Sequence, residues 1–366
     1  MNHFRYLKFT KNIFSHRQTL PLQLVLFVTS RCNLKCKHCF YWERLNNPAD
    51  ELTIKEYELL TLNKFKLLWL CLTGGEPFLR TDLPQIVELF CKNGTVLNIT
   101  IPTNGQLPEQ IFKISRDIVS ICSKYNTYVS VLLSVEGIGE LNDAIRGKGT
   151  FEKFIETYER LLPLSKYFKN FGLGAQFTQN NLNQKEMGEL YLFLKGMKFN
   201  NVTINTVRGN VKESELKNID GAYYRYVTKL AEHSNNRAGV KYYNFPFKLL
   251  AKARNYIVYD IIAQVIEDKK YIIPCYAGTI HAVISERGEV FPCEILDKSL
   301  GNLRDCNFKF DSIWFSPQAI KIREMIRQTK CFCTYECAIS ANVLMNKKYC
   351  FEMIRKAFKI AIKGGI

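Results

Sequence analysis

The 366-residue sequence has no hydrophobic run long enough to cross a lipid bilayer. The run 20–28, which follows a basic start, is interrupted by Gln23 and falls short of the roughly 20 apolar residues that a transmembrane helix needs. No small-residue cleavage site follows it, so it does not fit a secretory signal peptide either. We interpret this run as a buried strand and expect the protein to be cytoplasmic.

Low-complexity tracts and linkers rich in proline or serine are also absent. Apolar residues make up 47% of the chain, aromatic residues 13% and charged residues 23%. This composition excludes a disordered chain and allows a large buried core. The length suits two domains, or one large domain with a smaller one attached.

Acidic residues are missing before Glu43, and the whole chain carries a net charge of +17, from 51 basic and 34 acidic residues. The stretch 351–366 has apolar residues at helical spacing and one acidic residue, Glu352, against four basic ones: Arg355, Lys356, Lys359 and Lys363. We expect a basic amphipathic tail there. Peripheral membrane contact through the basic termini is one interpretation, and a solvated basic surface is the other. No nucleic-acid partner is predicted.

Six apolar, strand-like segments alternate with six amphipathic segments of helical periodicity over the first two thirds of the chain. The predicted strands are 22–30, 67–73, 96–102, 128–134, 171–178 and 202–207, and the predicted helices are 53–65, 83–92, 108–124, 151–162, 185–197 and 222–233. A capping box of Thr53 and Glu56 marks the first helix. This α/β alternation predicts a parallel sheet with right-handed crossovers. Six units, rather than eight, predict a partial (β/α)6 barrel of the TIM type.

Polar segments follow the predicted strands, and the carboxyl ends of parallel strands lie on one face of such a fold. A cysteine loop follows the first strand, Gly74–Pro77 the second and Thr103-Asn104-Gly105 the third, while Ser134–Gly137 ends the fourth. Asn205 and Arg208, at the end of the sixth strand, are predicted to face the same cavity and to bind a substrate carboxylate or phosphate. Strand-end hydrogen bonding or a surface arginine is the alternative.

Thirteen cysteines are present, and many of them lie in one group near each end of the chain. Clustering in a long chain favours metal ligation over a disulfide scaffold. Cys71, Cys91 and Cys122 lie in apolar stretches instead and are predicted to be buried small hydrophobic side chains. The first group, Cys32, Cys36 and Cys39, is a C-x3-C-x2-C loop. Three thiolates would leave one iron of a [4Fe–4S] cluster open, and a zinc site completed from elsewhere is the alternative.

This loop, with His38 before its last cysteine, and the later Gly74-Gly75-Glu76-Pro77 resemble the two signature motifs of the radical S-adenosylmethionine (SAM) superfamily. The resemblance implies that Cys32, Cys36 and Cys39 ligate a [4Fe–4S] cluster whose open iron SAM chelates. It also implies cofactor binding by Gly74, Gly75, Glu76, Pro77, Thr103, Asn104, Ser134 and Glu136; many relatives carry Asp where Glu136 stands. No catalytic side chain is assigned.

The activity that the resemblance implies is reductive cleavage of SAM. The resulting 5′-deoxyadenosyl radical would abstract a hydrogen atom from the substrate, so the chemistry belongs to the cofactor and the protein positions the substrate. The electron would come from a reductase, a flavodoxin or a ferredoxin.

The C-terminal cysteines resemble the auxiliary-cluster module called SPASM, or its shorter form, twitch. Cys275 and Cys293, with Gly288 between them, resemble its opening, whereas the closing cysteines depart from the full seven-cysteine pattern. The resemblance implies one auxiliary [4Fe–4S] cluster, held by Cys275 and Cys293 with two of Cys331, Cys333 and Cys337. Cys306 is spare, and Cys350 is spare or joins a second cluster. A zinc ribbon is the alternative.

Five segments are expected: a basic extension (1–21), the barrel (22–234), a helical linker (235–274), the SPASM/twitch domain (275–350) and the basic tail (351–366). Many relatives with this module modify ribosomally made peptides, often with a leader-binding domain ahead of the barrel. Here 31 residues precede Cys32. We therefore predict a small-molecule substrate of lipid or sugar type. The first alternative is a maturase of a ribosomally synthesised peptide. The second alternative is a non-catalytic iron–sulfur or zinc protein.

Overall fold

A nine-stranded sheet forms the centre of the computed structural model, which describes residues 19–48, 50–233 and 246–362. The strand order is β6-β5-β4-β3-β2-β1-β7-β8-β9. From β1 to β6, strands that are consecutive in the chain pair in parallel. These strands are β1 (Gln23–Thr29), β2 (Lys66–Gly74), β3 (Thr95–Thr103), β4 (Tyr128–Ser134), β5 (Phe171–Gln179) and β6 (Asn201–Thr206). The predicted partial parallel barrel is confirmed.

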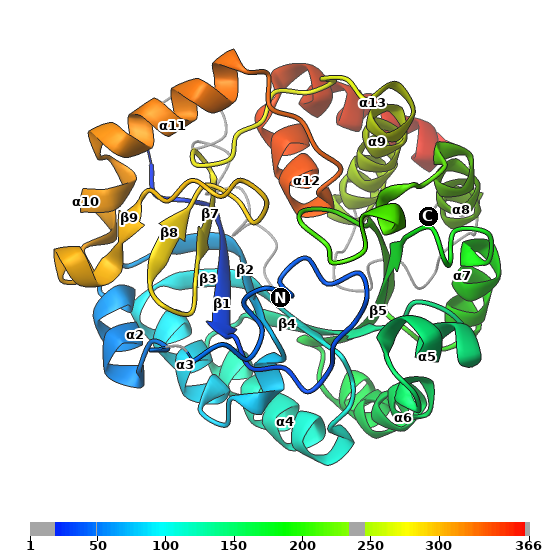
Figure 1. Ribbon diagram of the computed structural model, residues 1–366, viewed down its shortest axis with the longest axis horizontal. Coiled ribbons are helices and arrows are strands. Elements are labelled where there is room, and N and C mark those ends of the chain that lie inside the picture. Colours follow the sequence, from blue (N-terminus) through cyan, green and yellow to red (C-terminus); the bar gives the residue numbers. More distant parts are fainter. Residues whose placement is uncertain (1–18, 49, 234–245, 363–366) are drawn as a thin grey trace.

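Helices form a ring outside the strands (Figure 1). They are α2 (Ile54–Thr61), α3 (Leu83–Asn93), α4 (Pro108–Lys124), α5 (Glu140–Arg146), α6 (Thr150–Tyr167), α7 (Met187–Gly196) and α8 (Gly221–His233). Their apolar faces pack on the strands in one continuous core that includes Leu24, Leu70, Ile99, Val131 and Leu173. Burial of this apolar surface is the main favourable term in folding.

The predicted elements agree with the structure to within a few residues, and the bounds of β4 and α4 are correct at both ends. Two differences stand out. Helix α6 continues through Pro163 to Tyr167, because Leu161 and Leu164 on either side are buried in the core. Helix α5 was not predicted, because its seven residues are too few to establish a periodic pattern.

Strand β7 (His281–Ile284) extends the barrel sheet from the cysteine-rich region. It pairs in parallel with β1, with His281 opposite Gln23, and leads into antiparallel β8 (Glu289–Phe291) and β9 (Gly301–Asn302). The side chains of Val283 and Phe291 form a buried cluster with Val25 and Phe27 of β1. The region that we expected as a separate small domain therefore shares its sheet with the barrel.

The remaining helices are α9 (Phe247–Asp268), α10 (Phe310–Trp314), α11 (Pro317–Gln328), α12 (Glu336–Met345) and α13 (Lys347–Ile362). The predicted linker helix corresponds to α9, and the predicted tail helix to α13, which begins four residues earlier than expected. Parts of both predictions, 235–245 and 363–366, lie outside the described residues, as does most of the expected basic extension. No helix in the three described ranges is long and apolar enough to cross a membrane.

The predicted capping box is present and also ties the barrel to the cysteine-rich region. The Glu56 carboxylate accepts a hydrogen bond from the Thr53 N–H at 2.8 Å and pairs with Nε of Arg304 at 2.6 Å. These bonds lower the pKa of Glu56 to about 2, chiefly through Arg304. Arg304 belongs to the 3-10 turn η4 (Leu303–Cys306), so one carboxylate fixes segments far apart in sequence.

Candidate active site

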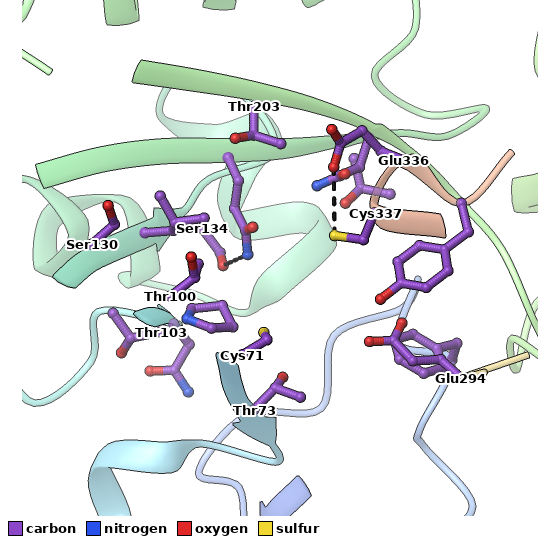
Figure 2. Close-up of a pocket in the computed structure, with 18 of the residues that line it drawn as sticks. Cys71, Thr73, Thr100, Thr103, Ser130, Ser134, Thr203, Glu294, Glu336 and Cys337 are labelled. Carbon is purple, nitrogen blue, oxygen red and sulfur yellow. Dashed lines mark hydrogen bonds between the residues drawn. The ribbon is translucent and has the colours of Figure 1, made fainter. Parts of the chain in front are cut away.

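A cavity of about 440 Å³ lies where the carboxyl ends of the barrel strands meet the cysteine-rich region. Figure 2 shows hydroxyl side chains such as Thr103 and Ser134 on one side, with Glu294, Glu336 and Cys337 on another. The predicted convergence of the strand ends is confirmed. All predicted cofactor and substrate residues except Pro77 line this cavity: Gly74, Gly75, Glu76, Thr103, Asn104, Ser134, Glu136, Asn205 and Arg208. Pro77 is buried and begins the 3-10 turn η2 (Pro77–Leu79) instead.

The first cysteine loop places its three thiols along this cavity. Asn46 fixes the start of the loop, because its side chain accepts from Cys32 N at 2.9 Å and donates to Cys32 O at 3.0 Å. Burial, with smaller effects of the neighbouring Cys36 and Cys32, raises the pKa of Cys39 to about 12. Three adjacent thiols facing one cavity suit a cluster with an exposed iron.

Gly74 and Gly75 pack directly on the backbone that leads from β1 into this loop. A Cβ on Gly74 would lie 2.2 Å from the Thr29 carbonyl oxygen, and one on Gly75 would lie 2.1 Å from that of Arg31. Two hydrogen bonds close this contact, from Gly75 N to Thr29 O and from Glu76 N to Arg31 O, both at 2.8 Å. Both positions therefore require glycine.

Replacing Gly75 by alanine is expected to lower the free energy of unfolding by about 1–3 kcal/mol, because the new methyl group would overlap a backbone oxygen that cannot move freely. Thermal unfolding of the anaerobic, cluster-loaded protein measures this. Gly196→Ala is the matched control, since its Cβ would meet nothing within 4 Å. A Gly75→Ala variant as stable as the control would contradict the close contact.

Glu76 holds the ends of β2 and β3 together. Its buried carboxylate accepts hydrogen bonds from Thr103 Oγ1 at 2.8 Å and from Asn104 N at 2.7 Å. Burial raises the pKa of Glu76 to about 7, against the opposing effect of these bonds. The Asn104 amide in turn donates to Asn33 Oδ1 at 2.7 Å and lies 3.9 Å from Cys32 Sγ. A continuous chain of polar contacts thus joins the glycine motif to the cysteine loop.

Glu136 is the centre of a buried polar group that also contains His38 and Arg146. Its Oε1 lies 2.9 Å from Arg146 Nη1 and 3.2 Å from His38 Nε2, and its Oε2 accepts from Thr178 N at 2.6 Å. Burial opposes ionisation, yet His38 and Arg146 hold the pKa of Glu136 below its ordinary value. This carboxylate therefore orients the histidine of the cysteine loop.

Arg146 is a site residue that the sequence analysis missed. It is 7% exposed, lines the cavity, and among the described residues its Nε has no hydrogen-bond partner. Burial opposes its charge, but the Cys36 thiol and the Glu136 carboxylate keep its pKa above the ordinary value. A fixed positive charge beside the cysteine loop stabilises thiolates. The sequence signal that could have identified Arg146 is its position directly before the Gly147 turn. It ends α5, the helix that was not predicted.

Arg208 bridges the cysteine loop and the C-terminal region. Its guanidinium pairs with Glu294 at 3.1 Å and lies 4.5 Å from the ring centroid of Tyr335 and 5.1 Å from that of Phe40. The charge that we expected to bind a substrate anion is thus matched by Glu294. Anion binding by Arg208 stays a prediction. Its contacts with Glu294, Tyr335 and Phe40 join the C-terminal region to the end of the cysteine loop.

In the second cysteine group, Cys275, Cys293, Cys331 and Cys333 each have another of these four thiols as an electrostatic neighbour, whereas Cys337 has Cys71. A hydrogen bond links the thiols of Cys275 and Cys331. Burial, with smaller effects of the nearby thiols of Cys333 and Cys331, raises the pKa of Cys293 to about 12. Cys337 instead lines the cavity, where its electrostatic neighbours include Glu336 and Cys71. Four grouped thiols suit one auxiliary cluster.

Cys71 was predicted to be a buried core side chain, and this was wrong. On β2 it alternates with Leu70 and Leu72, which are fully buried in the core, so it faces the barrel interior and lines the cavity. Cys91 and Cys122 are buried as predicted. In the described part of the chain no three His, Cys, Asp or Glu side chains are arranged to hold a single metal ion.

Two family models match the chain. Residues 26–174 match the model of the radical SAM superfamily, and residues 275–338 match that of an iron–sulfur cluster-binding domain, SPASM. The chain therefore carries a radical SAM domain followed by a SPASM domain. The first match contains the Cys32–Cys39 loop and the Gly74–Glu76 motif, and the second contains Cys275, Cys293 and the 331–337 cysteines. Both predicted family assignments are confirmed.

Several curated proteins are similar to this radical SAM chain. An uncharacterised protein of Methanocaldococcus jannaschii is 28% identical over 291 residues, which cover 78% of this chain and 89% of that protein. The antilisterial bacteriocin subtilosin biosynthesis protein AlbA of Bacillus subtilis is 25% identical over 84% of this chain and 62% of its own length. Mycofactocin maturase MftC of Mycolicibacterium smegmatis is 27% identical over 45% of this chain and 40% of its own length.

Solved structures confirm the fold. SuiB of Streptococcus suis bound to SAM aligns with a TM-score of 0.56 and 21% identity, covering 87% of this chain and 71% of SuiB. anSMEcpe with bound SAM and a peptide aligns with a TM-score of 0.56 and 17% identity, covering 94% and 98%. The parallel barrel and the cysteine-rich extension therefore occur together in known radical SAM structures.

A radical SAM domain with a SPASM domain indicates an enzyme whose cofactors are a [4Fe–4S] cluster, SAM and auxiliary iron–sulfur clusters, as predicted. The donor sets fit these groups, because three thiols line the cavity and several thiols of the second cysteine group are electrostatic neighbours of one another. The coarse prediction of a radical SAM enzyme with a SPASM domain is thus confirmed, and its reaction is not fixed by the family.

Proposed function

We propose that this radical SAM enzyme is a maturase of a ribosomally synthesised peptide. The observation that carries the proposal is the similarity to the subtilosin biosynthesis protein AlbA, which extends over 84% of the chain. Mycofactocin maturase is also similar, and SuiB, which shares the fold, has been solved with its precursor peptide SuiA. The small-molecule substrate that we first predicted gains no support from these relatives.

The lining of the cavity supports a peptide substrate. Amide and hydroxyl side chains from neighbouring strands border it, among them Gln176, Thr178, Thr203 and Asn205. Such groups both donate and accept hydrogen bonds, as the N–H and C=O groups of a peptide require. The cavity is continuous from the cysteine loop to Glu336 and Cys337 beside the auxiliary region. A peptide segment held there would contact both regions.

In this proposal, Cys32, Cys36 and Cys39 hold the catalytic cluster, and the segment Gly74–Glu76 borders SAM. When bound, the cluster and SAM supply the 5′-deoxyadenosyl radical that abstracts hydrogen from the peptide. The chain's own residues position the reacting groups and exclude water. Glu76 and Glu136 fix the strand ends and the cysteine loop, and Asn205 contacts substrate. A flavodoxin, ferredoxin or reductase as electron donor stays part of the proposal.

Deuterium transfer from a cell extract tests the substrate class. The reconstituted enzyme is incubated anaerobically with SAM, dithionite and an extract of its source cells grown in deuterated medium, and deuterium in 5′-deoxyadenosine is measured by mass spectrometry. We expect transfer from the peptide fraction, and we expect prior digestion of the extract with a protease to abolish it. Transfer that survives digestion and comes from the small-molecule filtrate would overturn the peptide proposal. The Cys36→Ala variant gives the background.

A further inference from the structure

Helix α13 is held against the protein by one face only. Its Ala357 is buried, and Met353, Ile360 and Ala361 pack with it against Leu249 and Ala253 of α9. Figure 1 places α13 beside α9, at the rim of the ring of helices. The inner face therefore anchors the helix without using its largest apolar side chains.

The outer face of α13 carries a stripe of large apolar side chains. Phe351 is 71% exposed, Ile354 46%, Phe358 67% and Ile362 84%. Spacings of three and four residues place these four on one side of the helix. Exposed apolar side chains scattered singly are ordinary, but a contiguous stripe indicates an interaction site.

The exposed charges of α13 are all positive. Lys347, Lys348, Arg355 and Lys359 are exposed, whereas the one acidic residue of the helix, Glu352, is partly covered. At 100° per residue, Arg355 and Lys359 fall along one flank of the apolar stripe. Long basic side chains beside an apolar stripe can reach phosphate groups while the stripe lies among acyl chains.

We propose that the outer face of α13 binds the surface of anionic lipid bilayers, with the helix lying in the interface plane. The charge pattern favours this occupant, because two copies of the helix would bring only positive charges together. Contact is peripheral, because no described helix can span a membrane. This proposal does not rest on the substrate class.

Vesicle binding by the full-length, cluster-loaded enzyme tests it. We expect the protein to sediment with vesicles of phosphatidylcholine and phosphatidylglycerol and to stay in solution with phosphatidylcholine alone. The double variants Phe351→Ser/Phe358→Ser and Arg355→Gln/Lys359→Gln should each bind anionic vesicles roughly tenfold more weakly. The matched control is Leu182→Ser/Leu192→Ser, whose side chains are 44% and 53% exposed elsewhere on the surface. It should bind like the unaltered enzyme.

Two measurements keep the outcome decisive. Circular dichroism and SAM cleavage should be unchanged in all three variants, because their residues lie outside the cavity. Light scattering without vesicles reports self-association. Anionic-vesicle binding that is absent in the unaltered enzyme, or undiminished in the Phe351/Phe358 variant, would overturn the proposal. So would self-association that the stripe variant removes, which would assign the face to a second copy of the chain.

Discussion

The Cys36→Ala variant is expected to cleave SAM to 5′-deoxyadenosine only at the background rate. Cys36 lies between Cys32 and Cys39 in a loop whose backbone is fixed by Asn46 and by a bond from Lys37 N to Ile145 O. The loop contains no fourth cysteine that could replace Cys36 as a ligand. Among the described residues, the other thiols that line the cavity are those of Cys71 and Cys337. The iron content should fall by about four atoms per chain. Chromatography of 5′-deoxyadenosine and iron analysis measure the two effects.

The control for this result is Cys306→Ala. The hydrogen bonds of the Cys306 thiol go to backbone carbonyls around η4, so its loss should leave both the iron content and SAM cleavage unchanged. Full SAM cleavage by Cys36→Ala would show that the loop does not hold the catalytic cluster. The barrel assignment would survive this outcome, because it rests on strand pairing and not on the ligands.

The second large effect separates two neighbouring cysteines of the auxiliary region. Cys333→Ala is expected to lose the auxiliary cluster, about four iron atoms per chain, while Cys337→Ala keeps the full content of about eight. The Cys333 thiol is grouped with that of Cys331, and Cys293 is affected by both. Cys337 lies four positions further along, at the start of α12, and lines the cavity.

Iron analysis and electron paramagnetic resonance of the reduced variants distinguish the two cases. Cys337→Ala should retain the signals of both clusters, and Cys333→Ala should retain one. The variants are matched in chemistry and are four positions apart, so a general loss of folding would reduce the iron of both. A Cys337→Ala variant that loses about four irons would place Cys337 among the ligands and contradict the grouping of Cys275, Cys293, Cys331 and Cys333.

The sequence was sufficient for the barrel and for the cofactor loop because the signals there are local. Strand and helix periods repeat within a few residues, and β4 and α4 were predicted at both ends. The three cysteines of the first group lie within eight positions, so their spacing restricts their geometry before the chain folds. Gly74 and Gly75 were also identified, although the reason for them, a close backbone contact with Thr29 and Arg31, is visible only in the fold.

The rest of the site depends on pairs that are distant in sequence. The ion pair of Arg208 with Glu294 spans 86 positions, and the hydrogen bond of Thr206 to Thr334 spans 128. No periodic pattern marks such pairs, because either partner alone resembles an ordinary strand end or loop residue. For the same reason, Cys71 resembled a core residue until the barrel determined which face of β2 points inward.

By itself the sequence determined the class of enzyme, because short-range spacing of cysteines and glycines is preserved in any fold that the chain adopts. Only the tertiary structure decided that β7 joins β1 in one sheet, that Glu136 pairs with both Arg146 and His38, and that Cys337 lines the cavity. These contacts form when segments separated by long stretches of chain are packed together, and burial then determines which charges pair and which thiols are neighbours.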